Sequence, residues 1–222
     1  MRFLIKILSC LLPWKLKRLV LIYYFKFDIH PKANIGLAWV FPSYLQMDEY
    51  SKIDHFTVAV NLDKIVLGKQ STIGRKNWIT GFPTKTNSAH FKHQTERVSE
   101  LVIGINSAIT KNHHIDCTNS ITIGSFVTIA GYYSQLLTHS INVFDNRQDS
   151  MPISIGDYCF IGTNVVILGG SNLPSYSVLG AKSLLNKTFT EEWKLYGGNP
   201  AKPIKEIPKD AQYFTRTSGY VI

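Results

Sequence analysis

Residues 155–187, IGDYCFIGTNVVILGGSNLPSYSVLGAKSLLNK, place an aliphatic residue at every sixth position. The residues that keep this spacing are Ile155, Ile161, Ile167, Leu173, Leu179 and Leu185. Neither an α-helix, with a period of about 3.6 residues, nor an alternating strand, with a period of about 2, requires such a spacing. A strict longer period is typical of a stack of similar units, each of which buries one side chain in a shared core.

The same period continues toward the N-terminus with two small shifts of register. It includes Ile103, Ile109 and Ile115, then Leu67, Ile73 and Ile79, and a degenerate set of Ile35, Phe41, Met47, Ile53 and Ala59. Aliphatic pairs two positions apart, such as Ile153 and Ile155, predict very short strands with both members facing inward. Glycine follows several of these pairs, and we expect it to supply the turn because it accepts backbone angles that a Cβ atom forbids.

Two stretches in the C-terminal half are similar to one known family. Residues 161–187 followed by YGGNPAKPIKEI (residues 196–207) resemble the hexapeptide-repeat acyltransferases, with the closest likeness to colanic-acid and capsular polysaccharide O-acetyltransferases. The resemblance implies an all-β fold, a left-handed parallel β-helix over residues 31–190 with a short C-terminal tail over residues 191–222. The handedness rests on the resemblance alone, because such a helix departs from the usual right-handed crossover rule.

The N-terminal segment, residues 1–30, has a different character. It is apolar and basic. Pro13 interrupts its apolar run, so the uninterrupted run is far shorter than the ~20 residues that a membrane span needs. Two interpretations stay open. The segment either forms a helical cap over the open end of the β-helix, or it is an amphipathic segment that lies on the inner face of the cytoplasmic membrane.

Composition limits the class of partner. The chain has 222 residues, 45% of them hydrophobic, and a net charge of +9, which suits one domain with a basic surface. Its Lys and Arg residues are scattered without a nucleic-acid recognition pattern, so we expect a cofactor phosphate or anionic lipid rather than nucleic acid. Cys10, Cys117 and Cys159 show no paired spacing and indicate reduced thiols in a cytoplasmic protein.

Two polar stretches interrupt the period, residues 82–100 and residues 140–152. Both are predicted to be loops that leave the rigid coils, where functional sites are often built. His139 directly precedes the second loop, and the resemblance implies that it is the general base of the reaction. Its unperturbed pKa of about 6.5 suits that role, although a single histidine in a sequence is more often structural.

A second group of candidates comes just before Ile115. Because Ile115 belongs to the core, strand alternation predicts that Asn112, His114 and Asp116 face outward. The resemblance implies that the Asn112 amide stabilises the reacting oxyanion. His114 and Asp116 are candidates for acceptor binding, with an ordinary solvated strand face as the equal alternative, and Asp116 is also a candidate to orient a histidine.

The resemblance also assigns residues to coenzyme A (CoA). They are Thr163, Ala181, Asn186, Lys187, Lys202 and Lys205. The lysines suit the phosphates of the cofactor, with simple solubility as the alternative explanation. The five histidines between residues 90 and 139 lack the spacing that zinc-binding β-helix enzymes use, so we expect no metal.

Together these features predict an acetyl-CoA-dependent O-acetyltransferase that modifies a sugar or polysaccharide precursor. The resemblance implies a homotrimer with each site between two subunits. Two alternatives remain: an antibiotic-modifying acetyltransferase of the same fold, and a non-catalytic β-helix that serves as an assembly module.

Overall fold

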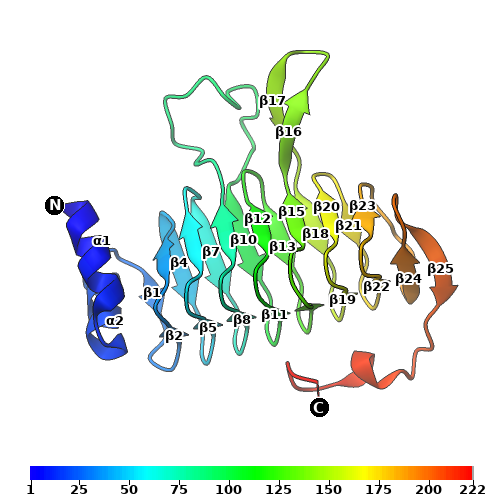
Figure 1. Ribbon diagram of the computed structural model, residues 1–222, viewed down its shortest axis with the longest axis horizontal. Helices are drawn as coiled ribbons and strands as arrows, with labels where there is room; N and C mark the ends of the chain where they lie inside the picture. The colour runs from blue at the N-terminus through cyan, green and yellow to red at the C-terminus, as the bar shows by residue number, and fades with distance from the viewer. Residues whose placement is uncertain (222) are drawn as a thin grey trace.

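The computed structural model describes residues 1–221 and consists mainly of short parallel strands stacked in three sheets (Figure 1). Sheet A contains, in order, β1 (Asp28–Ile29), β4 (Tyr44–Met47), β7 (Lys64–Leu67), β10 (Glu100–Ile103), β13 (Ile121–Ile123), β18 (Ile153–Ile155) and β21 (Asn172–Leu173). Sheet B contains β2 (Asn34–Ile35), β5 (Lys52–Ile53), β8 (Thr72–Ile73), β11 (Ala108–Ile109), β14 (Thr128–Ile129), β19 (Phe160–Ile161), β22 (Val178–Leu179), β24 (Lys194–Gly197) and β25 (Lys202–Glu206). Sheet C contains β3 (Trp39–Phe41), β6 (Val58–Val60), β9 (Trp78–Thr80), β12 (His114–Asp116), β15 (Gln135–Leu137), β20 (Val166–Leu168) and β23 (Leu184–Leu185).

The order of the strands defines a parallel β-helix. The chain visits sheets A, B and C in turn, and each strand pairs in parallel with its counterpart in the next coil, as in the match of Ile155 with Leu173. Only the last pair, β24 with β25, is antiparallel among the three sheets. The predicted β-helix is therefore present, and β24 carries sheet B beyond the expected limit at residue 190.

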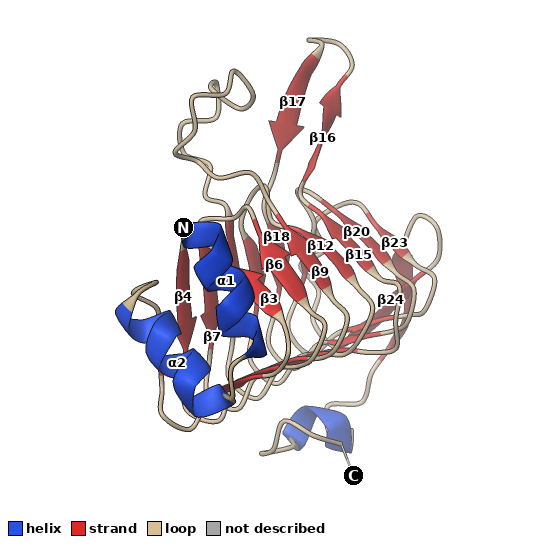
Figure 2. Ribbon diagram, turned by 60° about the vertical axis from the view of Figure 1, so that its left-hand side comes forward, coloured by secondary structure: helices blue, strands red, loops and turns tan. Residues whose placement is uncertain are grey.

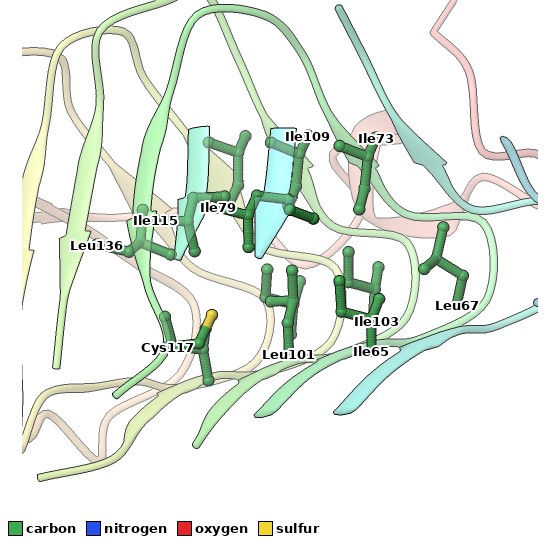
Figure 3. Close-up of a cluster of buried hydrophobic side chains, with 14 of the residues drawn as sticks. Ile65, Leu67, Ile73, Ile79, Leu101, Ile103, Ile109, Ile115, Cys117 and Leu136 are labelled. Atoms are coloured by element: carbon green, nitrogen blue, oxygen red, sulfur yellow. The ribbon is translucent and has the colours of Figure 1, made fainter. Parts of the chain in front are cut away.

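The six-residue period marks the core. Each of its members from Ile155 to Leu185 is at most 1% exposed. The degenerate N-terminal set is buried as well, with Phe41 the most accessible at 6%. Figure 3 shows Ile73 and Ile109 from sheet B facing Ile65 and Leu101 from sheet A across the interior. Pairs two positions apart point inward together, as predicted from strand alternation.

The glycines that follow the period act differently from the sequence prediction. Gly156 and Gly162 do not have positive φ angles, and the left-handed turn positions belong to Tyr158 and Asn164, each with φ of 56°. A Cβ atom on Gly156 would lie 2.4 Å from the Ser175 nitrogen of the next coil, and one on Gly162 would lie 2.6 Å from the Ala181 nitrogen. Glycine is required there by the close spacing of the coils, not by the turn.

This explanation predicts different outcomes at two glycines with the same place in the period. Gly162→Ala should lower stability by about 1–3 kcal/mol, because the new methyl group displaces backbone in the next coil. Gly180→Ala is the matched control, since its Cβ atom would meet nothing closer than 3.5 Å. Thermal unfolding of both variants checks this. Equal melting temperatures would mean that coil spacing does not select the glycine.

Two insertions leave the coils at the same corner, between sheets C and A. Residues 81–99 form a loop without strands between β9 and β10, which agrees with the prediction. Residues 140–152 are not a simple loop, because most of them belong to a hairpin of β16 (His139–Asn142) and β17 (Arg147–Ser150). Figures 1 and 2 show the loop and the hairpin rising side by side from one side of the β-helix.

The N-terminal segment forms two helices, α1 (Arg2–Leu11) and α2 (Trp14–Tyr23), which cover one end of the β-helix (Figure 2). Leu21 and Phe25 extend the hydrophobic core beneath them. The two helices therefore occupy the position that the cap interpretation expects. Within residues 1–221, no helix has both the length and the apolar character to cross a membrane.

Candidate active site

Strand pairing in sheet C brings His139 next to Asp116. Strands β12 and β15 are parallel neighbours, with Asp116 opposite Leu137, so His139 follows two residues later at the same corner. The Nδ1 atom of His139 lies 2.5 Å from Oδ2 of Asp116, and the His139 backbone nitrogen lies 3.3 Å from the same oxygen. This contact joins residues from two successive coils and fixes the orientation of the imidazole ring.

Asp116 does not face outward as strand alternation predicted. Its side chain lies at the corner where β12 ends, and the residue is only 4% exposed. Its other oxygen, Oδ1, accepts hydrogen bonds from the backbone nitrogen and the hydroxyl of Thr118, at 3.1 and 2.7 Å. The carboxylate is thus held on both sides, and it contacts His139 instead of solvent.

These contacts shift the pKa values of both partners in the directions that an ion pair requires. Burial opposes the charged form of Asp116, but hydrogen bonds from His139 and Thr118 outweigh it and lower the pKa of the carboxyl group. The hydrogen bond to Asp116 raises the pKa of His139, and burial offsets part of that effect. Because Nδ1 is engaged by the carboxylate, Nε2 is the nitrogen left for proton transfer.

His139 lies in the wall between two cavities. The first, the hairpin cavity, has a volume of about 350 Å³ and is lined by His139, Ser140, Asp149, Met151, Gly169 and Asn186. The second, the loop cavity, has a volume of about 220 Å³ and is lined by Gly81, Phe91, Asp116, Thr118, His139 and Gln148. The His139 imidazole can therefore contact one ligand bound beside the C-terminal coils and a second ligand bound beside the inserted loop.

Residues of the inserted loop complete the second cavity. The Phe91 ring meets the His139 ring edge to face, with centroids 6.1 Å apart. His93 Nε2 lies 2.6 Å from Oδ1 of Asp149, which joins the loop to the hairpin. The sequence marked this loop as an interruption of the period that contains His93, but nothing in its residues predicted the contacts of Phe91 and His93.

The other predicted residues of this region lie elsewhere. Asn112 lies in the turn before β12, with φ of 56°, whereas Asp116 is the last residue of that strand, so the two lie at opposite ends of β12. His114 is exposed on the outer face of sheet C. Its neighbour His113 is buried, and burial lowers its pKa to about 4, so it is a neutral core residue that accepts a hydrogen bond from the Ser134 backbone.

The residues assigned to CoA fall into three places. Thr163 and Ala181 lie with Asn112 along the corner between sheets B and C, at the far end of the sheet C strands from His139. Asn186 lines the hairpin cavity, and Lys187 follows it with its ammonium 5.1 Å from the Phe189 ring. Lys202 and Lys205 are exposed on β25 at the C-terminal end of the β-helix. A single chain does not gather all of them around His139.

Within residues 1–221, no group of three or more His, Cys, Asp or Glu side chains is arranged to hold a metal ion. The three cysteines in this part of the chain are free thiols, and burial raises the pKa of Cys159 to about 12 and that of Cys117 well above its usual value. Neither buried thiol therefore supplies a nucleophile at neutral pH.

No protein-family model and no curated protein matches this sequence. Among solved structures, a hexapeptide-repeat acetyltransferase from Vibrio cholerae is 30% identical over 49% of this chain, with a TM-score of 0.46, and the chain spans 64% of its length. A second structure, a hexapeptide-repeat acetyltransferase from Vibrio cholerae O1 biovar eltor complexed with acetyl coenzyme A, is 23% identical over 65% of this chain and 69% of its own, with a TM-score of 0.47.

The polySia-specific acetyltransferase NeuO is 19% identical, with 83% of this chain and 84% of NeuO covered and a TM-score of 0.52. At that identity the likeness concerns the fold. The chain therefore shares its overall fold with an acetyltransferase, and its solved structural neighbours include hexapeptide-repeat acetyltransferases.

Proposed function

We propose that this protein is an acetyl-CoA-dependent O-acetyltransferase in which His139 is the general base and Asp116 positions it. The observation that carries the proposal is the hydrogen-bonded Asp116–His139 pair in the wall between two cavities. A histidine held by a carboxylate on one nitrogen and accessible on the other is suited to move a proton between two bound molecules. An assembly module has no need of such a pair.

The reaction follows from this geometry. Nε2 of His139 takes the proton from an acceptor hydroxyl while the hydroxyl oxygen forms a bond to the thioester carbonyl carbon. The carbon–sulfur bond then breaks, the acetyl group stays on the acceptor oxygen, and the departing CoA thiolate takes the proton from His139. Asp116 remains ionised throughout and stabilises the imidazolium that forms between the two steps.

The two cavities suit different substrates. The hairpin cavity reaches Asn186 in the C-terminal coils, which are the coils that the sequence resemblance assigns to CoA. We therefore place the thioester there and the acceptor in the loop cavity, beside Phe91. The acceptor is a sugar hydroxyl in this proposal, in a nucleotide sugar, a lipid-linked oligosaccharide or a capsular or exopolysaccharide repeat. The fold shared with NeuO, an enzyme specific for polySia, supports a carbohydrate acceptor.

The proposal includes a homotrimer. Asn112, Thr163 and Ala181 lie at the opposite end of the sheet C strands from His139, so one chain does not bring them to its own base. A neighbouring subunit that presents this corner to His139 would supply the Asn112 amide to the oxyanion and the wall for the CoA arm. The left-handed winding of the coils and a cytoplasmic location, consistent with the free thiols, belong to the same proposal.

Lysines at the C-terminal end are expected to contribute to CoA affinity. The double variant Lys202→Glu with Lys205→Glu should weaken CoA binding by at least about tenfold, because it replaces two phosphate-facing cations by anions. Lys52→Glu, at the N-terminal end of the same sheet, is the matched control and should bind CoA as the wild type does. Calorimetry measures both affinities, and equal affinities would assign the two lysines to solubility alone.

The direct test of the function is release of free CoA thiol from acetyl-CoA in the presence of candidate acceptors. We expect acceptor-dependent release with at least one sugar nucleotide, oligosaccharide or polysaccharide, and mass spectrometry should show one added acetyl group on the acceptor. If calorimetry detects no CoA binding, the acetyltransferase proposal is wrong. Release with an aromatic or macrocyclic antibiotic but no sugar would instead assign the protein to the antibiotic-modifying class.

A further inference from the structure

The first helix of the cap turns its apolar side away from the protein. Ser9 is 1% exposed and faces the β-helix, whereas Phe3, Leu4, Leu8 and Leu11 are exposed by 65%, 62%, 63% and 72%. An amphipathic helix that only covered a core would place these side chains inward and its polar residues in water. Helix α1 has the opposite orientation.

Helix α2 shows the same inversion in part, because Leu21 packs into the core while a lysine also faces inward and other apolar side chains face outward. Lys17 is only 3% exposed, while Leu16, Leu19 and Tyr23 are exposed by 52%, 45% and 70%. The inward lysine has a clear role, because its ammonium donates hydrogen bonds to the carbonyl oxygens of Gly36 and Ala38, at 2.8 and 3.3 Å.

The open end of the β-helix explains why polar groups face inward. An unpaired edge presents backbone carbonyl groups that need donors. Besides Lys17, Arg18 donates to the carbonyl oxygen of Ile29 at 2.9 Å, and the Cys10 thiol contacts that of Ala38 at 3.4 Å. The edge accounts for the inner side of the cap, but it leaves the apolar outer side without any function in the folded chain.

The apolar surface continues from the cap onto the first coils. The Phe3 ring meets the ring of Trp39 at 5.9 Å between centroids. Trp39, Phe56 and Val58 then line an apolar cavity of about 300 Å³ beside Cys10. A continuous apolar area of this kind on a soluble domain usually marks an interaction site.

The charge of the N-terminal segment indicates which kind of partner this apolar surface binds. All charged residues before Asp28 are basic: Arg2, Lys6, Lys15, Lys17, Arg18 and Lys26. Lys17 and Arg18 bind the edge of the β-helix, and Arg2, Lys15 and Lys26 are the exposed cations. Two copies of this surface would place like charges against each other, which disfavours self-association. Basic residues flanking exposed leucine and aromatic side chains are typical of a helix that binds an anionic lipid surface.

We propose that α1 and α2 dock the protein on an anionic membrane surface, with their axes in the plane of the membrane and Leu4, Leu8 and Leu11 inserted among the lipids. A helix of 10 residues is about 15 Å long, so each helix lies in the interface and does not cross it. The two interpretations of the N-terminal segment are then compatible, because its inner side caps the coils while its outer side binds lipid. The inference is independent of the proposed reaction.

The test is sedimentation of the full chain with vesicles of phosphatidylcholine, with and without phosphatidylglycerol. We expect binding to the anionic vesicles that weakens with added salt, and much weaker binding to pure phosphatidylcholine. The double variant Leu8→Gln with Leu11→Gln should bind at least about tenfold more weakly, because two side chains lose their burial in lipid. Replacing Lys15 by Gln and Lys26 by Asn should cost about fivefold for each charge.

A matched control comes from the turn of the hairpin, where Val143 and Phe144 are exposed by 77% and 97%. Val143→Gln with Phe144→Gln should bind vesicles as the wild type does. The inference is wrong if the leucine variant binds like the wild type, or if the hairpin variant is the one that loses binding. It is also wrong if the leucine variant lowers the solution mass, because the outer side of the cap would then be a contact between subunits.

Discussion

Replacement of His139 by alanine is expected to slow acetyl transfer by about 10²–10⁴-fold, which is the usual contribution of a positioned general base. Two histidines of the inserted loop lie in this region: His93 is held by Asp149, and His90 lines the loop cavity but has no contact with Asp116 like that of His139. The affinity for CoA should change little, because the imidazole acts on the proton rather than on the cofactor phosphates. Thiol release under saturating acetyl-CoA measures the effect on kcat.

The matched control for that variant is His55→Asn in an N-terminal coil. His55 has a side chain 58% exposed and accepts a hydrogen bond from the Leu37 backbone, far along the chain from the corner of His139. Its variant should transfer acetyl groups at the wild-type rate. If His139→Ala releases CoA as fast as the wild type, the assignment of the general base is wrong.

The second large effect is expected for Asp116→Asn. An amide in place of the carboxylate no longer selects the Nδ1–H form of His139 and no longer stabilises the imidazolium, so kcat should fall by about 10²–10⁴-fold. Asp157→Asn is the control, since Asp157 accepts a backbone hydrogen bond from Ser125 at a different corner. It should leave the rate unchanged.

The pH dependence separates a positioning role from a merely structural one. His139 acts as a base only when Nε2 is unprotonated, so the rate of the wild type falls as the pH drops through the pKa of His139. Asp116 raises that pKa, and its replacement should therefore move the acidic limb of the pH–rate profile to lower pH. A reduced rate with an unshifted acidic limb would contradict the pairing.

The six-residue period was sufficient to predict a stack of similar units and its core, and the family resemblance identified that stack as a β-helix. Each coil repeats the same burial requirement, so aliphatic residues at fixed spacing record the architecture locally. The glycines show the limit of that record. Their presence was visible in the sequence, but the reason for it was not. The backbone of Gly162 lies too close to that of Ala181 in the next coil for a side chain to fit, and no local rule describes such a contact.

The sequence named both residues of the candidate pair but not their arrangement. The resemblance pointed to His139, which lies beside an interruption of the period, and alternation placed Asp116 on the wrong side of its strand. Alternation applies inside a strand, whereas Asp116 ends β12 and is covered by a residue from the next coil. The inserted loop was recognised as an interruption, but its contact with His139 through Phe91 depends on how that loop folds back.

The repeat therefore specifies the coils, the core residues and the places where insertions leave them, because all of these follow from side-chain spacing along the chain. The pairing of His139 with Asp116, the two cavities on either side of it and the outward leucines of the cap depend on contacts between distant segments. They arise when neighbouring coils and insertions stack, since stacking alone decides which side chains meet and which unpaired edge must be covered.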